Sequence, residues 1–367
     1  KGAHYTTEKN ILKLIEPLFM DELRAEFARL VARKDNRRRS ELQKFQQKLA
    51  ALTFFDPACG CGNFLVIAYR ELRLLEHDVI GELMDYERDD NGDIKLRLDA
   101  SESSQVNVDQ FYGIELEEFP ARIAETAMWM MDHIMNNRLS LAFGLNAARF
   151  PLRASPTILA ATDALETPWA DLLPPEKCAY IFGNPPFIGA KFQSDEQRAR
   201  IKRIAELGGS GGTLDFVTGW FLKAGAYVQR GTAAIGFVAT NSITQGEQVA
   251  QLWPQLFDKY KLDIAFAHRT FAWGSDARGK AHVHCVIIGL TRRDQTPAIR
   301  RLFSYDDVNG DPHESQHTVL TAYLFDGANL GNPHLVVREV SSPCNGLVAL
   351  RYGSQPIDGG HLILNSE

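Results

Sequence analysis

The stretch Thr53-Phe-Phe-Asp-Pro-Ala-Cys-Gly-Cys-Gly-Asn-Phe64 sets the class of fold expected for this chain. A short apolar run ends at Asp56, and a turn with two glycines leads directly into a helical pattern. This succession is typical of the first strand, loop and helix of a doubly wound sheet. Downstream, short apolar runs alternate with helical patterns, which predicts a largely parallel sheet covered by helices on both faces.

The pattern along the chain gives the expected elements. Strands are expected at 53–56, 111–115, 157–161, 178–183, 232–239, 262–267 and 281–289, and helices at 8–34, 40–52, 63–77, 118–136, 213–229 and 246–259. The run 281–289 alternates and then becomes wholly apolar, as an added antiparallel strand would. We therefore predict an α/β fold with a Rossmann-like, doubly wound, mixed seven-stranded sheet and an N-terminal helical extension.

Three regions are expected on this basis. Residues 1–52 form an N-terminal helical segment, and 53–295 form the Rossmann-like core. The acidic and Ser-rich stretch 78–108 interrupts the first crossover and is interpreted as a surface insertion without chemistry. Residues 296–367, rich in Gly, Pro and Asn, are interpreted as a C-terminal extension toward a further region. The N-terminus lacks an initiator Met and a signal pattern, so we interpret the chain as an excised piece.

Composition narrows the class of protein. With 45% hydrophobic and 23% charged residues the chain is an ordinary globular protein, and no apolar stretch is long enough for a membrane helix. Five scattered cysteines without paired spacing argue against disulfides and zinc and fit a reducing cytoplasm. The net charge of −6 gives no general attraction to nucleic acid. The basic cluster 33–39 is interpreted as a solvated helix junction, with phosphate contact as the alternative.

The first loop indicates the kind of ligand. Gly60 and Gly62 permit close backbone approach, although a tight turn alone would also use them. Leu65 stands where the dinucleotide fingerprint needs its third glycine, which disfavours a pyrophosphate-binding loop and an NAD site. Asp56, at the strand end, is placed to pair with a cationic amino group.

Two further carboxylates follow expected strands. Glu115 ends the second strand, where an acid commonly accepts both hydroxyls of a ribose, although it could instead cap the next helix. Asp163 follows the third strand and could accept a hydrogen bond from an adenine N6, with a helix N-cap as a nearly equal alternative.

The tetrapeptide Asn184-Pro185-Pro186-Phe187 follows the expected strand 178–183. Its two prolines fix φ and leave backbone carbonyls that no local N–H claims. An Asn side-chain oxygen and the Pro185 carbonyl suit the two N–H donors of an exocyclic amine, and Phe187 offers a face for a planar base.

In their order along the chain, these residues resemble conserved motifs of a known family. Gly2–Thr6, Asp56–Phe64, Glu115, Asp163 and Asn184–Phe187 look like motifs X, I, II, III and IV of the gamma class of DNA adenine-N6 methyltransferases. More narrowly, Gly2–Thr7 and Phe271–Trp273 followed by 281–289 look like the methyltransferase part of single-chain type II (IIG and IIL) restriction-modification enzymes. The resemblance covers residues 1 to about 290.

The resemblance implies a class I methyltransferase fold, S-adenosylmethionine as cofactor, no metal, and double-stranded DNA as partner. It further implies a prokaryotic cytoplasmic protein whose nuclease and target-recognition regions share the polypeptide. The implied cofactor-contacting residues are Tyr5, Thr6, Asp56, Pro57, Ala58, Cys59, Gly60, Gly62, Asn63, Phe64, Glu115, Asp163, Ala164, Asn184 and Phe221. For Phe221, a position in the core is the alternative.

By the same resemblance, Asn184, Pro185, Pro186 and Phe187 form the catalytic loop that holds the target adenine. Phe271 or Trp273 is the candidate second wall for the flipped base. Phe187 stands where Tyr is frequent in the family, so the stack survives but a phenolic hydrogen bond is lost.

Two other functions remain as alternatives. A protein glutamine amide or an RNA guanine amine also presents a planar NH₂ to an Asn-Pro-Pro loop, and an inactive cofactor-binding or DNA-binding scaffold would keep the same fold. His282 and His284 lie on one face of a strand without a carboxylate or cysteine at ligand spacing, so no metal site is expected. Ser210–Thr213 is interpreted as a flexible loop.

Overall fold

The computed structural model describes residues 7–84, 104–143, 154–207, 213–273, 283–338, 340, 343 and 346–348. The chain divides into two compact units, Lys1–Val336 and Val337–Glu367, and the first holds every strand and helix given below. Tyr5, Thr6 and His282 lie outside the described residues, as do 85–103 of the expected insertion and Ser210–Gly212.

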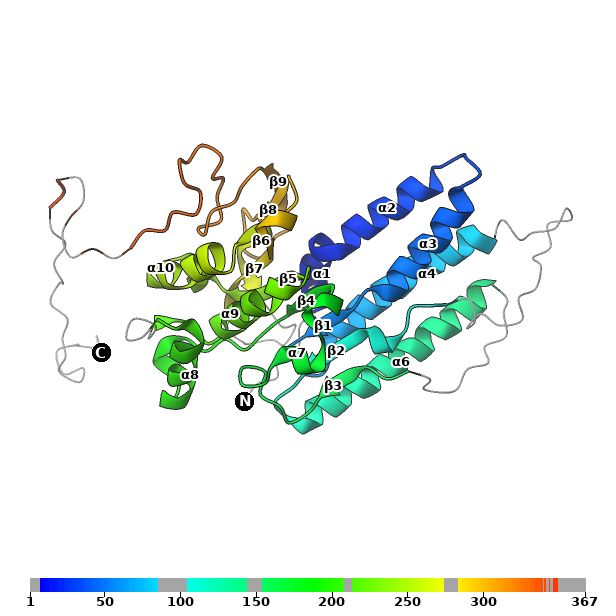
Figure 1. Ribbon diagram of the computed structural model, residues 1–367, viewed down its shortest axis with the longest axis horizontal. Helices are drawn as coiled ribbons and strands as arrows, with labels where there is room; N and C mark the ends of the chain where they lie inside the picture. The colour runs from blue at the N-terminus through cyan, green and yellow to red at the C-terminus, as the bar shows by residue number, and fades with distance from the viewer. Residues whose placement is uncertain are drawn as a thin grey trace, which may run out of the picture. The chain divides into compact units, whose positions relative to one another are not determined.

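In the part of the chain that the structure describes, one sheet runs in the order β3-β2-β1-β4-β5-β7-β6-β8-β9 (Figure 1). Its strands are β1 (Phe54–Asp56), β2 (Phe111–Ile114), β3 (Thr157–Leu159), β4 (Tyr180–Gly183), β5 (Ala234–Thr240), β6 (Leu262–Trp273), β7 (Val283–Arg292), β8 (Arg300–Ser304) and β9 (His313–His317). Neighbouring strands from β3 to β5 pair in parallel, whereas β7 is antiparallel to both β5 and β6. The predicted doubly wound α/β sheet with an added antiparallel strand is confirmed.

The predicted number of seven strands is wrong, because β8 and β9 extend the sheet beyond β6. β8 pairs in parallel with β6 and antiparallel with β9. β9 has the sequence His-Glu-Ser-Gln-His, and its first four residues are exposed. A strand that buries no apolar face has no alternation to reveal it. Both strands lie in the stretch interpreted as a C-terminal extension.

Helices precede and connect the strands. They are α1 (Glu8–Ile15), α2 (Asp21–Val31), α3 (Arg38–Ala51), α4 (Asn63–Met84), α6 (Glu118–Phe143), α7 (Trp169–Leu172), α8 (Asp195–Ala205), α9 (Thr218–Tyr227) and α10 (Glu247–Pro254). A π-helical segment, Glu16–Met20, joins α1 to α2, and another, Gln255–Lys259, follows α10. Across the described ranges, no helix is long and apolar enough to cross a lipid bilayer.

Side chains along each strand point alternately to the two faces of the sheet, and both faces are buried. Phe54 and Phe182 belong to one core with residues of α1, α3, α4 and α6, whereas Phe55 and Ile181 belong to the other core with residues of α7, α8, α9 and α10. Figure 1 shows these helices around the sheet. Helices on both faces of a largely parallel sheet define a doubly wound architecture.

The basic cluster 33–39 joins α2 to α3. Arg33 forms an ion pair with Asp35, with its Nη2 2.8 Å from the carboxylate, and Arg38 forms one with Glu82 on α4. These contacts within the protein favour the interpretation as a helix junction.

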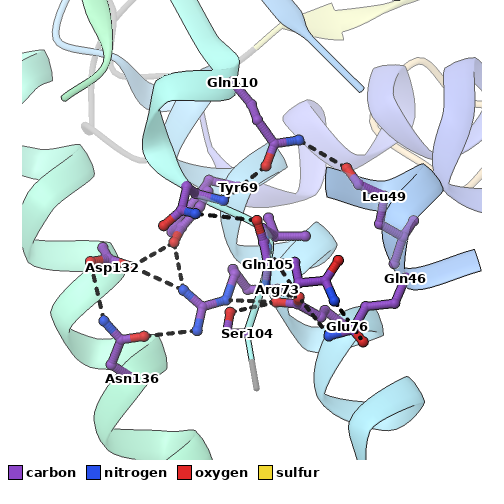
Figure 2. Close-up of polar contacts among 12 residues, drawn as sticks. Gln46, Leu49, Tyr69, Arg73, Glu76, Ser104, Gln105, Gln110, Asp132 and Asn136 are labelled. Atoms are coloured by element: carbon purple, nitrogen blue, oxygen red, sulfur yellow. Dashed lines mark hydrogen bonds and ion pairs between the residues drawn. The ribbon is translucent and has the colours of Figure 1, made fainter. Parts of the chain in front are cut away.

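A buried polar network around Arg73 and Glu76 connects α4 to α3, to α6 and to the segment before β2 (Figure 2). Oε1 of Glu76 accepts hydrogen bonds from Gln46 Nε2 and from the backbone N–H groups of Gln105 and Val106, and Oε2 accepts one from the Ser104 hydroxyl. Arg73, also on α4, lies 3.4 Å from Glu76. The carboxylate of Glu76 therefore has four donors that connect α4, α3 and the segment before β2.

Arg73 extends this network to α6. Its Nη1 donates to Asp132 at 2.9 Å and to the Tyr69 hydroxyl at 2.6 Å, while Nη2 donates to Asn136 at 2.9 Å (Figure 2). The guanidinium is buried, and its charge is neutralised by carboxylates on two sides.

Candidate active site

Four of the predicted site residues, Asp56, Glu115, Asp163 and Asn184, lie at or just beyond the carboxyl ends of β1, β2, β3 and β4. β1 lies between β2 and β4, so the chain order reverses at β1, and this is where open α/β sheets bind ligands. The loop after β1 crosses to the end of β2: Cys59 N–H donates to the Ile114 carbonyl at 3.1 Å. The residues of motifs I, II and IV are thereby brought to one edge.

The two glycines of the first loop have different surroundings. Gly60 has φ +54°, and a Cβ there would meet no atom within 4 Å, which leaves room for a ligand. Gly62 has φ +81°, and a Cβ there would lie 2.8 Å from the Ala124 Cβ on α6. Gly62 is therefore required by helix packing, and Gly60 borders the open part of the loop.

Asp56 is a buried carboxylate, 1% exposed, at the end of β1. Its Oδ1 accepts a hydrogen bond from the Ala58 N–H at 2.9 Å. Burial raises the pKa of Asp56 from 3.8 to about 8; the Ala58 N–H opposes this rise and the Glu115 carboxylate adds to it. A cationic group beside Asp56 would relieve the cost of its buried charge. The amino group of a ligand, predicted from the sequence as the partner of Asp56, would be such a group.

Glu115 links the first loop to the end of β2. Its Oε2 accepts a hydrogen bond from Gly60 N–H at 2.9 Å, and its Oε1 accepts one from Glu117 N–H at 3.0 Å. Glu117 lies just before α6, so its contact with Glu115 agrees with the alternative that Glu115 caps this helix. Each carboxylate oxygen still has a lone pair for a further donor, so the ribose role stays a prediction.

Asp163 lies in a turn after β3, and no helix begins there. Its Oδ1 accepts a hydrogen bond from Leu165 N–H at 2.9 Å, and its Oδ2 forms an ion pair with Arg200 on α8. Its side chain is 26% exposed, so it is open to a ligand. A role toward an adenine amine would have to share the carboxylate with Arg200.

The Asn184 loop leaves β4 beside Asp56. The Asn184 Oδ1 is buried and has no hydrogen-bond partner among the described residues. Pro185 is buried, Pro186 is exposed, and Phe187 is half-buried against both cores. A buried acceptor without a donor is costly, so the geometry favours a ligand that donates to Asn184.

Three predicted aromatic residues lie in the protein interior. Phe221 is fully buried, and its ring packs edge-on against Phe237 with centroids 5.3 Å apart, as the core alternative expects. Phe271 is also fully buried and stacks on Tyr305, and Trp273 is 6% exposed. In this structure, none of the three presents an open ring face.

Several polar residues that support the site were not identified from sequence. Asp215 accepts hydrogen bonds from the backbone of Ile188, Trp220 donates to the Pro57 carbonyl, and Lys223 donates to carbonyls beside Asp163. They contact backbone atoms far away in the chain, so no local spacing reveals them. Among the described residues, no group of three or more His, Cys, Asp or Glu side chains could hold a metal ion.

The strand order β3-β2-β1-β4-β5-β7-β6 and this carboxyl-edge site define the class: a Rossmann-like methyltransferase fold. The chain belongs to the family described as MmeI, DNA-methyltransferase domain, whose model matches residues 31–304. The predicted relationship to the methyltransferase part of single-chain type II restriction-modification enzymes is therefore confirmed.

Two relatives support this membership. DNA methyltransferase A of Bacillus subtilis (strain 168) is 35% identical over 366 residues, which are 99% of this chain and 38% of that protein. A solved structure of the type IIL restriction-modification enzyme MmeI in complex with DNA matches with a TM-score of 0.88 and 45% identity, over 98% of this chain and 45% of that one. The chain thus spans less than half the length of either relative.

Proposed function

We propose that this chain is the methyltransferase region of a restriction-modification protein and transfers a methyl group from S-adenosylmethionine to N6 of an adenine in duplex DNA. The observation that carries the proposal is the buried Asn184 Oδ1, which lacks a donor among the described residues. Asn184 follows Gly183, which packs against the buried Asp56 at the switch point of the sheet. Family membership supports the same chemistry.

The residues present fit this cofactor. Asp56 would pair with its amino group, Glu115 would accept ribose hydroxyls, and Asp163 would accept from its adenine amine. Gly60 leaves space for close backbone approach. When bound, S-adenosylmethionine supplies the methyl group and a positive charge that makes it transferable.

The Asn184 loop would activate the acceptor. A base inside a duplex cannot present its amine in line with a methyl group, so the adenine must leave the stack, at a cost of a few kcal/mol. Stacking on the half-buried Phe187 offsets part of this cost. The Asn184 Oδ1 and the Pro185 carbonyl would accept both N6 hydrogens and stabilise the positive charge that develops on the nitrogen. The proton then leaves to water.

The full-length protein provides the test. It is incubated with isotopically labelled S-adenosylmethionine and duplex DNA, and the modified nucleoside is identified by mass spectrometry. We expect labelled N6-methyladenine. In parallel incubations RNA or a glutamine-containing peptide replaces the DNA. Label in either of these, or in another nucleoside of the DNA, with none in adenine, would refute the assignment of the acceptor.

We further propose that the full-length protein carries target-recognition and nuclease regions, because its relatives are more than twice as long as this chain. Cleavage of unmethylated plasmid DNA by the full-length protein, and protection of that plasmid by prior methylation, would test this organisation.

A further inference from the structure

The short helix α9 is connected by polar side chains to each of three loops that carry the proposed site residues. The connections come from Asp215, in the turn directly before α9, and from Trp220 and Lys223, which are three residues apart and lie on one side of the helix. None of the three belongs to the residues assigned to ligand contact above.

Asp215 holds the end of the Asn184 loop. This residue is 3% exposed, and its Oδ1 accepts hydrogen bonds from Ile188 N–H at 3.1 Å and Val217 N–H at 3.2 Å. Its Oδ2 accepts one from the Thr240 hydroxyl at the end of β5. The Ile188 carbonyl in turn accepts from Phe216 N–H at 3.0 Å. Both backbone groups of Ile188, the residue that follows Phe187, are therefore bound to the segment directly before α9.

Trp220 holds the first glycine loop. Its indole Nε1 donates to the Pro57 carbonyl at 3.0 Å, and the side chain is buried. Pro57 lies between Asp56 and Ala58, whose N–H is the donor to the Asp56 carboxylate. The hydrogen bond therefore connects α9 to the loop that would bind the amino group of the cofactor.

Lys223 holds the turn after β3. Its Nζ donates to three backbone carbonyls, those of Ala164 at 2.7 Å, Leu165 at 3.1 Å and Thr167 at 2.6 Å. An ammonium has three N–H donors, so this turn uses all of them. Ala164 is adjacent to Asp163, which would contact the cofactor adenine.

We propose that Asp215, Trp220 and Lys223 are positioning residues through which α9 sets the alignment of methyl donor and target amine. The inference rests on the proposed function. In each case at least one bound backbone atom belongs to a proposed ligand contact or to its neighbour along the chain. Because a displacement of about 1 Å between reacting groups can cost ~10²-fold in rate, attachment of all three loops to one rigid helix would preserve the reacting geometry.

If α9 has this role, Lys223 and Asp215 should affect different steps: Lys223 should affect cofactor binding, and Asp215 should affect methyl transfer. Lys223→Met keeps the length of the side chain but removes the donors, so we expect the Kd for S-adenosylmethionine to rise about 5-fold or more, with kcat at saturating cofactor within about 2-fold. Trp220→Phe should weaken cofactor binding less. Asp215→Ala should leave the Kd within about 2-fold and lower kcat about 10-fold or more. Asp215→Asn should restore most of kcat, because an amide oxygen still accepts both N–H groups.

Tyr227→Phe is the matched control on the same helix. The Tyr227 hydroxyl donates to the Leu173 carbonyl, which is not adjacent to a proposed contact. Its loss should lower the thermal unfolding temperature without changing Kd or kcat. If the Lys223 and Asp215 variants change Kd and kcat in parallel, or only lose stability as the control does, the positioning role is refuted.

Cofactor binding to the full-length protein is measured by calorimetry and methyl transfer to duplex DNA by incorporation of label. A wild-type protein that neither binds S-adenosylmethionine nor methylates DNA would refute the proposed function itself. A wild-type protein that does both, with variants that behave like Tyr227→Phe, would refute only the inference about α9.

Discussion

Two buried carboxylates, one at the end of β1 and one within α4, differ in their partners. Asp56 lies just before α4 and is 1% exposed, and Glu76 lies within α4 and is 0% exposed. Glu76 accepts four hydrogen bonds, whereas the described contacts of Asp56 include one, from Ala58 N–H. Equal burial with unequal pairing distinguishes the structural carboxylate of Glu76 from the carboxylate of Asp56, which we propose pairs with a ligand.

Because Glu76 is fully paired within the protein, we expect its removal to affect folding and to leave the site intact. Glu76→Ala leaves four donors without their acceptor and removes one of the two carboxylates that neutralise Arg73, so the free energy of unfolding should fall by about 3–5 kcal/mol. The Kd for S-adenosylmethionine should stay within about 2-fold, measured on protein that remains folded. Glu82→Ala, on the same helix but in a partly exposed ion pair with Arg38, should cost only about 0–1 kcal/mol. A loss of cofactor binding in the Glu76 variant would remove the distinction between the two regions.

Asn184→Ala should have the opposite effect. The wild-type oxygen is buried without a described donor, so its removal should cost little stability, whereas methyl transfer should fall by ~10²-fold or more. Single-turnover rates and thermal unfolding measure the two quantities. Asn136→Ala is the matched control, because the Asn136 oxygen accepts from Arg73 and its loss should lower stability without affecting transfer. Unchanged transfer by Asn184→Ala would contradict its catalytic role.

Asp56→Asn should stabilise the free protein while weakening its ligand. The neutral amide removes the cost of a buried charge, so the free energy of unfolding without cofactor should rise by on the order of 1–3 kcal/mol. The Kd for S-adenosylmethionine should rise about 10-fold or more, because the charged partner of the amino group is lost. Chemical denaturation and calorimetry test both, with Glu76→Gln as the control that should lose stability.

The pKa of Asp56, about 8, also predicts a pH dependence for cofactor binding. Because this pKa is raised above the ordinary value of 3.8, the contribution of Asp56 to stability is present at low pH and is lost as the pH rises toward 8. Affinity for the cationic cofactor should rise over the same range, by up to about tenfold per pH unit between pH 6 and 7.5, with proton release on binding. Calorimetry in buffers of different ionisation enthalpy measures that release. Asp56→Asn should abolish the dependence, and a flat wild-type profile would refute this account.

The sequence predicts the parts of the fold that bury apolar faces. β1, β4 and β5 are short apolar runs between helical patterns, so their order and parallel pairing could be anticipated. β9 could not, because it pairs through its backbone and is largely exposed. α8 was also missed, since it buries only Ile201 and Ala205, although Ser194 and Gln197 form a capping box that marks its start.

The residues of the candidate site also fall into those that the sequence could predict and those that it could not. Asp56, Glu115 and Asn184 follow directly on apolar runs, so strand ends identify them. Trp220 and Lys223 lie among apolar residues of a helix, so the sequence pattern does not mark them. They donate hydrogen bonds to backbone carbonyls that are distant in the chain. The residues proposed to contact a ligand are marked by local sequence, whereas the residues proposed to position those contacts become visible only in the folded protein.

The packing of Gly183 against Asp56 has a consequence for protein engineering. A Cβ at position 183 would lie 2.4 Å from the Asp56 Oδ1, and Gly183 has φ +154°. Any side chain at 183 would therefore displace the carboxylate that the cofactor is proposed to need. A library that randomises position 183 and is selected for activity should return glycine alone. The residues at positions 56 and 183 constrain each other, and this limits how far the Asn184 loop can be redesigned.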